Sequence, residues 1–364
     1  MRLRILLFLL ACGAAAVPAG PGEAGKKNAP DTKTAKAFRE DCAAKAAAAN
    51  TMTVAGRDGW LFLANELRHV GAGKFWGQDA QKASRATRAE TRDPLPAILD
   101  YKQRLERLGI ELILVPVPPK AFIYPDKVSA AVKVGKADQP PRLDVYHQRF
   151  YRLLRDKGVK VIDLADDLLA HRLDNDGAMY CRTDTHWSGL ACVRVARRLA
   201  KELKGRPWMR DVPRRGFTSR EETVSVEGDL LRAMKQDARP APEVLRLRVV
   251  EVKTDSGPRP VEPDRASPVL LLSDSHGLVF HTGGDMYTTG AGLADQLAME
   301  LGFPVDLLGV RGSGATPARV ALYRRGRADP DYIARKKVII WCFAAREFTE
   351  TTGWSEVPVV KATQ

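Results

Sequence analysis

The stretch "PLPAILDYKQRLERLG" (94–109), followed directly by "IELILVPVP" (110–118), decides the fold class. Apolar residues recur in the first segment at helical spacing, with Ile98, Tyr101 and Leu105 on one face, and a glycine ends the pattern. The second segment is an unbroken apolar run, which is typical of a strand buried on both faces. We therefore predict a helix that leads into an interior strand of a sheet.

The same helix-and-strand unit recurs along the chain. Helical patterns at 142–158, 291–302 and 315–325 precede apolar runs at 159–164, 303–310 and 336–344, and a further apolar run lies at 267–273. Short apolar strands that alternate with helices predict an α/β fold with a mostly parallel sheet and helices on both faces. Between 205 and 266 the alternation fails, because this segment has several prolines and no long helical pattern. We expect it to be an irregular insertion and not a second core.

The N-terminus has the features of a secretory signal. Two arginines precede an apolar run and small residues in 1–19, which is too short for a permanent membrane span. "LLAC" (9–12) also resembles a lipoprotein box that would place a lipid on Cys12, so both forms of processing stay open. Residues 20–40 are polar and rich in Gly, Pro and Lys, which indicates a flexible lead. We expect the remaining 41–364 to form one domain, and the protein to be periplasmic or secreted.

Charge and cysteine content narrow the possible partners. The formal net charge is +14, which in an exported protein favours an anionic partner such as an acidic polysaccharide or a membrane surface. The arginines are scattered and no nucleic-acid-binding signature is present, so nucleic acid is not expected. Cys42, Cys181, Cys192 and Cys342 permit disulfides in three pairings, and a Cys181–Cys192 bridge or two buried thiols are equally compatible with the sequence.

Two polar segments, "TDTHWS" (183–188) and "SDSH" (273–276), carry the residue types of a serine hydrolase triad. Ser275 follows the apolar run at the carboxyl end of a predicted strand, where open α/β sheets bind ligands. A serine hydroxyl needs a base to take its proton, and the base needs an acid to orient it. Asp184 and His186, with one residue between them, supply both. The alternative is that each aspartate is only a turn or capping residue.

The order of several motifs resembles the alginate O-acetylation proteins of the AlgX/AlgJ type, which have an SGNH-hydrolase-like domain. The motifs are "GRDGWLFLANELRHV" (56–70), "VPVPPKAFIYPDKV" (115–128), "TDTHWS", "SDSH" and "WCFAARE" (341–347). This resemblance implies an SGNH-hydrolase-like, flavodoxin-like fold. It also implies acetyl transfer to an exopolysaccharide hydroxyl, with Ser275 carrying the acetyl group, His186 as base and Asp184 orienting it. The acetyl group would come from a donor supplied by a membrane-bound acyltransferase, without a cofactor.

Two departures from the family pattern concern the turn at the nucleophile. Ser273 stands where the family has glycine, and His276 stands where aromatic residues are common. A carbohydrate acetyl esterase with the same triad and a non-catalytic polysaccharide-binding or assembly protein remain alternatives. A metal site formed by His276 and His281 with the Asp184–His186 pair is not expected, because the spacing fits no zinc motif.

Five further residues are candidates for substrate binding: Lys120, Tyr124, Trp187, His276 and Arg346. Lys120 and Tyr124 follow a predicted strand and would line the pocket, although an ordinary turn explains them equally well. Trp187 is expected to pack beneath the histidine, and Arg346 forms either an ion pair with Glu347 at the site wall or a surface pair. For the oxyanion hole, the backbone N–H of Ser275 is the first expected donor, and the loop "VRGSG" (310–314) is the candidate for the second.

Overall fold

The computed structural model describes residues 31–134, 139–234, 239, 241–329 and 331–361. The predicted signal, Cys12 and residues 20–30 of the lead lie outside this part of the chain. The lead is shorter than expected, because Lys33–Ala48 forms helix α1. Phe38 and Cys42 lie on its buried face, which gives the segment an apolar stripe that anchors it to the core. Within the described residues, no helix is both long and apolar enough to cross a membrane.

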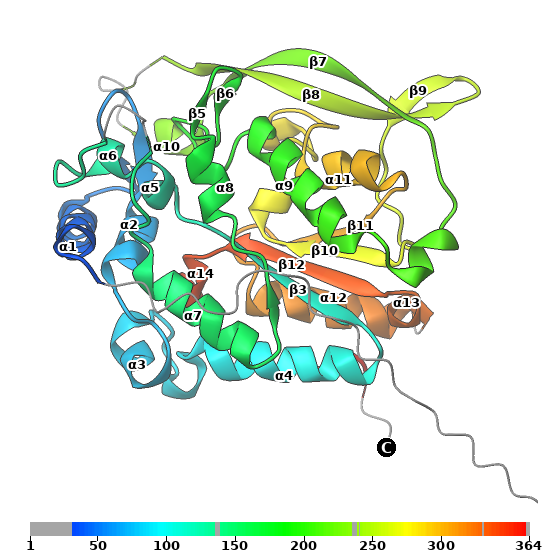
Figure 1. Ribbon diagram of the computed structural model, residues 1–364, viewed down its shortest axis with the longest axis horizontal. Coiled ribbons are helices and arrows are strands. Elements are labelled where there is room, and N and C mark those ends of the chain that lie inside the picture. Colours follow the sequence, from blue (N-terminus) through cyan, green and yellow to red (C-terminus); the bar gives the residue numbers. More distant parts are fainter. Residues whose placement is uncertain (1–30, 135–138, 235–238, 240, 330, 362–364) are drawn as a thin grey trace, which may run out of the picture.

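The central sheet confirms the predicted fold class. Its five parallel strands are β3 (Glu111–Val117), β4 (Lys160–Val161), β10 (Val269–Ser273), β11 (Asp306–Gly309) and β12 (Val338–Ala344). They lie in the order β11-β10-β12-β3-β4 (Figure 1). Counted from β10, this is the 2-1-3-4-5 order of flavodoxin-like sheets, with the chain starting at the fourth strand. The strand order explains why the acid and histidine segment precedes the serine segment in sequence.

Alternate side chains of each strand enter two separate cores. On β12, Ile340 and Cys342 pack with helices α9 (Gly189–Leu203) and α11 (Leu293–Leu301). Ile339 and Trp341 face the opposite way and pack with α4 (Pro94–Arg107), α7 (Val145–Asp156) and α12 (Thr316–Ala328). Figure 1 shows α9 and α11 above the sheet, and α4 and α12 below it. Both faces are therefore covered, as the apolar strands require.

Local capping explains where the helices begin. The side chain of Asp93 accepts a hydrogen bond from the Leu95 N–H (3.0 Å), and Pro94 occupies the first turn of α4. The side chain of Ser188 accepts from the Ala191 N–H at 3.3 Å at the start of α9. Because Ser188 follows His186 by two residues, the cap of α9 also fixes the end of the segment that carries the histidine.

The segment 205–266 is more ordered than expected. It carries an antiparallel sheet of β7 (Phe217–Val226), β8 (Glu243–Thr254) and β9 (Gly257–Pro260). This ribbon crosses over α9 and α11 (Figure 1), and its buried residues Leu247 and Val249 join the core on that side of the central sheet. The two long strands β7 and β8 contain no proline, and together they form a sheet that covers the helical layer.

Short elements complete the fold. The remaining strands are β1 (Thr53–Ala55), β2 (Leu61–Leu63), β5 (Leu173–Asp174) and β6 (Gly177–Ala178). The remaining α-helices are α2 (Ala64–Gly71), α3 (Ala80–Ala83), α5 (Lys120–Ile123), α6 (Pro125–Val128), α8 (Ala165–Ala170), α10 (Asp229–Arg232), α13 (Asp331–Ala334) and α14 (Glu347–Glu350). Single 3-10 turns are η1 (Gly77–Asp79), η2 (Ala89–Thr91), η3 (Pro207–Arg210), η5 (Ser275–Gly277) and η6 (Gly284–Met286).

Candidate active site

Ser275 lies at the carboxyl end of β10, where the sequence placed it. Asp274 caps the turn η5 by accepting a hydrogen bond from the His276 N–H at 2.8 Å, and Ser275 is the first residue of that turn. A Cβ atom on Gly277 would lie 2.5 Å from Oγ of Ser273, so the turn needs glycine at this position. Ser273 itself fits in the extended end of β10.

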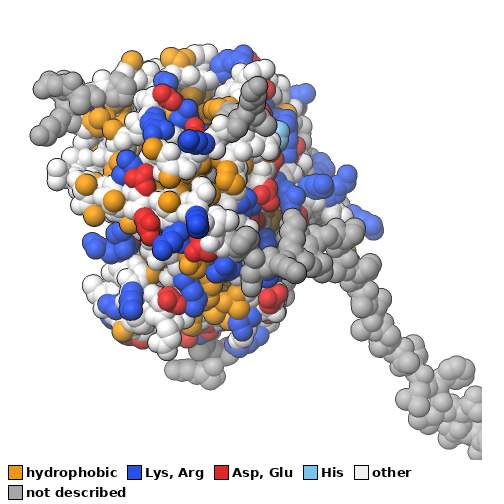
Figure 2. All heavy atoms as spheres, turned by 60° about the vertical axis from the view of Figure 1, so that its left-hand side comes forward, with side chains coloured by type: hydrophobic (Ala, Val, Ile, Leu, Met, Phe, Trp, Pro, Cys, Tyr) orange, Lys and Arg blue, Asp and Glu red, His pale blue; other side chains and the backbone are white. Residues whose placement is uncertain are grey.

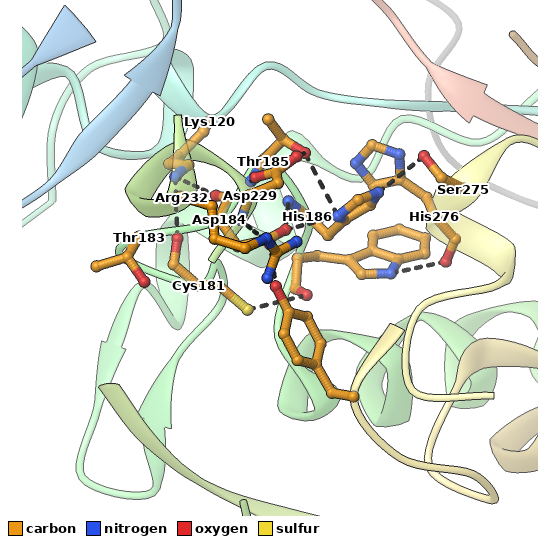
Figure 3. A network of polar contacts seen from close by, with 12 residues as sticks. Lys120, Cys181, Thr183, Asp184, Thr185, His186, Asp229, Arg232, Ser275 and His276 are labelled. Atoms are coloured by element: carbon orange, nitrogen blue, oxygen red, sulfur yellow. Dashed lines mark hydrogen bonds and ion pairs between the residues drawn. The ribbon is translucent and has the colours of Figure 1, made fainter. Parts of the chain in front are cut away.

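A chain of hydrogen bonds joins the three residues of the predicted triad. His186 Nε2 lies 2.8 Å from Ser275 Oγ, and His186 Nδ1 lies 2.6 Å from Asp184 Oδ1. The backbone N–H of His186 also donates to Asp184 Oδ1, at 2.9 Å. Figure 3 shows the histidine between the other two side chains. All three residues are largely buried, and Ser275 is 7% exposed. The arrangement has the contacts of a nucleophile, its base and the group that orients the base.

The second oxygen of Asp184 is held by two residues that the sequence did not single out. Oδ2 accepts a hydrogen bond from the hydroxyl of Tyr287 and another, of 2.8 Å, from the backbone N–H of Asp229. The carboxylate of Asp229 in turn accepts from Thr185 N (2.8 Å) and Thr185 Oγ1 (2.7 Å). Asp229 belongs to the insertion, so this segment contributes directly to the support of the acid.

Tyr287 has an uncommon backbone conformation. Its φ of 77° and ψ of −75° correspond to a γ-turn that is strained for a residue with a side chain. Such strain is maintained only where the surrounding structure compensates for it, and it is concentrated at functional sites. Here the hydrogen bond to Asp184 is the contact that this conformation brings about.

The electrostatics of the triad favour an ionised acid beside a basic histidine. Burial acts to raise the pKa of Asp184, but the charge and hydrogen bond of His186 and the Tyr287 hydroxyl outweigh it and hold that pKa well below its ordinary value. Burial acts to lower the pKa of His186, and the Asp184 carboxylate more than offsets this, so the pKa of His186 is raised. The carboxylate therefore remains ionised at neutral pH and increases the proton affinity of the base.

A second aspartate and histidine pair lies on either side of Ser275 in the sequence. Asp274 Oδ1 lies 3.1 Å from His276 Nδ1, and Asp274 Oδ2 accepts from the Ala344 N–H at 2.8 Å. The ring centroids of His276 and His186 are 5.0 Å apart. Burial lowers the pKa of His276 and the opposing effect of Asp274 does not overcome it, so the ring is neutral at neutral pH.

Lys120 is not placed as a pocket residue, contrary to the sequence-based expectation. Its side chain is buried, and its ammonium group donates to the backbone carbonyls of Leu61 (2.7 Å), Cys181 (2.9 Å) and Asp184 (2.5 Å). Three carbonyls use the three N–H donors of an ammonium group. Lys120 therefore supports the backbone of the segment that carries Asp184.

Tyr124 and Trp187 are also internal. The Tyr124 hydroxyl donates to the carbonyl of Arg172 (2.6 Å) and accepts from the Met179 N–H (2.9 Å), while its ring stacks on Trp60. These contacts occupy the hydroxyl and the ring of Tyr124, so neither group is available to a ligand. Trp187 is fully buried and donates from Nε1 to the backbone carbonyl of His276 at 3.0 Å. It ties the histidine segment to the nucleophile turn, in agreement with the expected packing role.

Arg346 and the loop 310–314 lie beside the turn of the nucleophile. Arg346 is partly exposed, and its Nη1 atom is buried without a partner among the described residues. The expected pair with Glu347 is replaced, since Glu347 accepts a hydrogen bond from Ser313 Oγ at 2.5 Å and burial raises its pKa to about 7. A Cβ atom on Gly314 would lie 3.2 Å from the backbone nitrogen of Asp274, so this loop packs directly against the turn.

The cysteines form no disulfide within the described chain: Cys42, Cys181, Cys192 and Cys342 are buried free thiols. The Cys181–Cys192 bridge that the sequence permitted is absent, and the alternative of two buried thiols holds. Cys181 is near the triad segment, where its Sγ atom lies 3.5 Å from the Trp187 carbonyl.

Potential metal ligands at the site already have protein partners. Atoms of Asp184, His186 and Asp229 lie within 4.8 Å of one another, but each is engaged by the hydrogen bonds described above. His281, the other residue considered for such a site, instead contacts Asp295 at 3.0 Å.

A cavity of about 430 Å³ near Trp208 and Phe303 adjoins the opposite ends of the strands, away from the triad.

Comparison with known proteins identifies the family. Residues 53–345 match the family described as "SGNH hydrolase-like domain, acetyltransferase AlgX". The protein belongs to this family. This membership confirms the resemblance seen in the motifs, and the matched range includes both segments of the triad.

Relatives and solved structures agree with this membership. The chain is 31% identical to a probable alginate O-acetylase AlgJ of Pseudomonas aeruginosa over 54% of its own length and 46% of that protein. It is 27% identical to the probable alginate O-acetylase AlgJ of Pseudomonas putida over 61% of its length and 54% of that protein. The chain thus spans about half the length of these curated relatives.

The fold likeness is broader than the sequence likeness. The O-acetyltransferase domain of Pseudomonas putida AlgJ superposes with a TM-score of 0.60 at 22% identity, covering 82% of this chain and 92% of that domain. Pseudomonas aeruginosa AlgX superposes with a TM-score of 0.53 at 20% identity, covering 85% of this chain and 65% of that one. These similarities confirm the SGNH-like α/β fold.

Proposed function

We propose that this protein is an O-acetyltransferase that carries an acetyl group on Ser275 and passes it to a hydroxyl of an extracellular polysaccharide. The observation that carries the proposal is the hydrogen-bonded series Asp184–His186–Ser275, with contacts of 2.6 and 2.8 Å. A non-catalytic binding protein has no need for a serine at hydrogen-bond distance from a buried, carboxylate-supported histidine. Family membership supports the same chemistry.

In the first half-reaction, Ser275 Oγ attacks the carbonyl carbon of the acetyl donor. His186 Nε2 takes the hydroxyl proton, and Asp184 stabilises the imidazolium that forms. The bond between the acetyl carbon and the donor heteroatom breaks, and His186 returns the proton to that leaving group. The products are acetyl-Ser275 and the deacetylated donor, with His186 again neutral.

In the second half-reaction, a sugar hydroxyl replaces the donor. His186 takes the proton of this hydroxyl as its oxygen bonds to the acetyl carbon, and the ester bond to Ser275 Oγ then breaks. His186 returns the proton to Oγ, which regenerates the free serine. Water in place of the sugar would give acetate, so the same site would act as an esterase if water reached the ester first.

Backbone donors are available for the oxyanion that forms in both steps. The N–H of Ser275 makes no hydrogen bond within the described part of the chain and lies at the start of η5. The loop 310–314 is the candidate for a second donor, because Gly314 packs against the backbone of Asp274. Donors fixed in place before the reaction stabilise developing charge without reorganisation.

The acceptor is proposed to be an anionic polysaccharide, with alginate as the first candidate because relatives are named as probable alginate O-acetylases. The net charge of +14 favours a polyanion. Figure 2 shows Lys and Arg side chains spread among acidic and apolar ones, so the attraction is distributed over this face. An exported location and an acetyl donor supplied by a membrane-bound acyltransferase complete the proposal.

The test uses purified protein, a chromogenic acetyl ester as donor and alginate oligosaccharides as acceptors. Acetate release and mass gain on the sugar are followed together. We expect mass gain with the natural protein and a loss of several orders of magnitude with Ser275→Ala or His186→Ala. Ser273→Ala is the matched control, since Oγ of Ser273 is buried without a partner. Acetate release alone, across uronic-acid and neutral acceptors, would replace the transferase by an esterase.

A further inference from the structure

The site contains the same local motif twice. In Asp184-Thr-His186, the histidine N–H donates to Asp184 Oδ1 (2.9 Å) and its Nδ1 lies 2.6 Å from the same oxygen. In Asp274-Ser-His276, the corresponding contacts to Asp274 Oδ1 are 2.8 and 3.1 Å. The nucleophile is the middle residue of the second motif. The two imidazoles lie next to each other beside Ser275 (Figure 3), with ring centroids 5.0 Å apart.

The outer nitrogen of the second histidine is unused. His276 Nδ1 faces the ionised Asp274 and therefore carries the ring proton, which leaves a lone pair on Nε2. This Nε2 makes no hydrogen bond in the part of the chain that the structure describes, and it is not among the fully buried atoms that lack a partner. His276 is only 1% exposed, so this unpaired acceptor lies inside the site, beside His186 and Ser275.

The surroundings keep this acceptor neutral and oriented. Asp274, His186 and Arg346 are the charged or titratable groups that act on His276, and burial disfavours its protonation. Asp274 is also held in place by the Ala344 N–H at the end of β12, which donates a hydrogen bond to its carboxylate. Trp187 donates its hydrogen bond to the backbone carbonyl of His276, and the two rings meet edge-on with centroids 5.4 Å apart, so the hydrogen bond leaves the ring nitrogens free.

We propose that His276 binds the hydroxyl next to the one that is acetylated, so that the acceptor is a vicinal diol of a sugar ring. This inference rests on the proposed function. Neighbouring hydroxyl oxygens on a ring are close enough for one to donate to His186 Nε2 and the other to His276 Nε2. His186 alone moves the proton: it takes it from the reacting hydroxyl and returns it to Ser275 Oγ, while His276 only accepts a hydrogen bond.

This arrangement discriminates sugar from water. A water molecule can occupy the position at His186 but cannot bridge both imidazoles as a rigid diol does. The extra hydrogen bond raises the occupancy of the correctly oriented acceptor, which is the way positioning accelerates a bimolecular step. Acetyl transfer to Ser275 from the donor involves no diol and does not need His276.

The experiment compares the natural protein with His276→Phe and His276→Gln, using a chromogenic acetyl ester as donor. Cyclohexane-1,2-diol and cyclohexanol are the paired acceptors, and alginate oligosaccharides are the polymeric probe. The rate of acetyl-Ser275 formation, the ratio of transfer to hydrolysis and the KM for each acceptor are measured. His171→Gln is the matched control, because His171 is partly exposed and contacts Asp174 and not the triad.

With His276→Phe we expect acetyl-Ser275 formation to fall less than transfer to the diol. The KM for the diol should rise about three- to tenfold, the loss expected for one neutral hydrogen bond, and the transfer ratio should fall to match. Cyclohexanol transfer should not change, and His276→Gln should recover part of the preference for the diol. If His276→Phe does not fold, the ratio of transfer to hydrolysis in His276→Gln tests the proposal instead.

Two results would overturn the inference. One is an unchanged preference for the diol over cyclohexanol in both variants. The other is a slowing of acetyl-Ser275 formation as large as the slowing of transfer, which would place His276 in the acylation machinery. The absence of acetyl-Ser275 in the natural protein would instead contradict the proposed function itself, so the two failures are distinguishable.

Discussion

The hydroxyl of Tyr287 donates a hydrogen bond to Oδ2 of Asp184, the carboxylate oxygen that faces away from His186. Tyr287 follows Ser275 in the sequence, whereas Asp184 precedes Ser275 by about ninety residues. The backbone at Tyr287 is strained, with a φ of 77°, and its side chain makes this hydrogen bond in that strained conformation. Tyr287 thus links the segment after Ser275 to the carboxylate that contacts His186.

Replacing Tyr287 by Phe should raise the pKa of His186 further. The hydroxyl disperses part of the Asp184 charge, and without it the carboxylate attracts the histidine proton more strongly. Because the base must be neutral to act, the acid limb of the pH–rate profile should move to higher pH, and the rate at neutral pH should fall about three- to tenfold. Steady-state hydrolysis of a chromogenic acetyl ester measures both. Tyr323→Phe, on the outer face of α12, is the control, and an unmoved acid limb would count against this role.

Asp229→Asn should shift the same limb the other way. Burial lowers the pKa of His186, while Asp184 and then Asp229 raise it, so removing the Asp229 charge lowers the pKa of the base. The amide still offers an oxygen to the Thr185 N–H, and the backbone N–H that holds Asp184 remains. The acid limb should move to lower pH, with little loss of folding free energy. Asp255→Asn, in the exposed β8–β9 turn, controls for the general loss of one charge.

Lys120→Met should cost stability and not substrate affinity. The variant leaves the carbonyls of Leu61, Cys181 and Asp184 without their donor, which is a cost of about 3 kcal/mol or more in the free energy of unfolding. Urea unfolding measures it, with Lys133→Met on the surface as the control. A higher KM at unchanged stability would restore Lys120 to the substrate pocket.

Acid should destabilise the fold through a buried histidine pair. His69 Nε2 and His147 Nε2 are 2.8 Å apart, and burial lowers the pKa of His147 from 6.5 to about 4. The unfolded chain therefore binds the proton first, so this stability is complete above about pH 6.5 and is lost as the pH falls from there towards 4. One such histidine accounts for about 3 kcal/mol. His147→Gln should flatten the decline in unfolding free energy between pH 7 and 4.5, and an unchanged decline would exclude the pair as its cause.

The sequence was informative where a pattern is local. The apolar runs of β10 and β12 and the periodicity of α4 and α11 are set by neighbouring residues, so strands and helices could be predicted close to their observed positions. The repeated Asp-x-His spacing at 184–186 and 274–276 was also visible in the sequence, and it was the signal that could have paired His276 with His186.

Contacts between distant residues that no motif marks could not be predicted. Asp229 and Tyr287 lie 45 and 103 residues from Asp184 and belong to no motif, so only the folded chain brings them to its carboxylate. The role of Lys120 depends on burial of its ammonium group among three carbonyls, which a strand-end position does not indicate. The β7–β8 ribbon was missed because prolines around it obscured the strand pattern.

The most direct test of the account is to trap the acetyl group on the enzyme. The protein is mixed with a chromogenic acetyl ester, quenched in acid within the first turnover, digested and analysed by mass spectrometry. We predict one acetyl group on the peptide that contains residues 273–276, assigned by fragmentation to Ser275, present in Ser273→Ala and absent in Ser275→Ala. Full turnover of the ester by Ser275→Ala, or an acetyl group on another residue that forms and decays at the rate of turnover, would contradict the account.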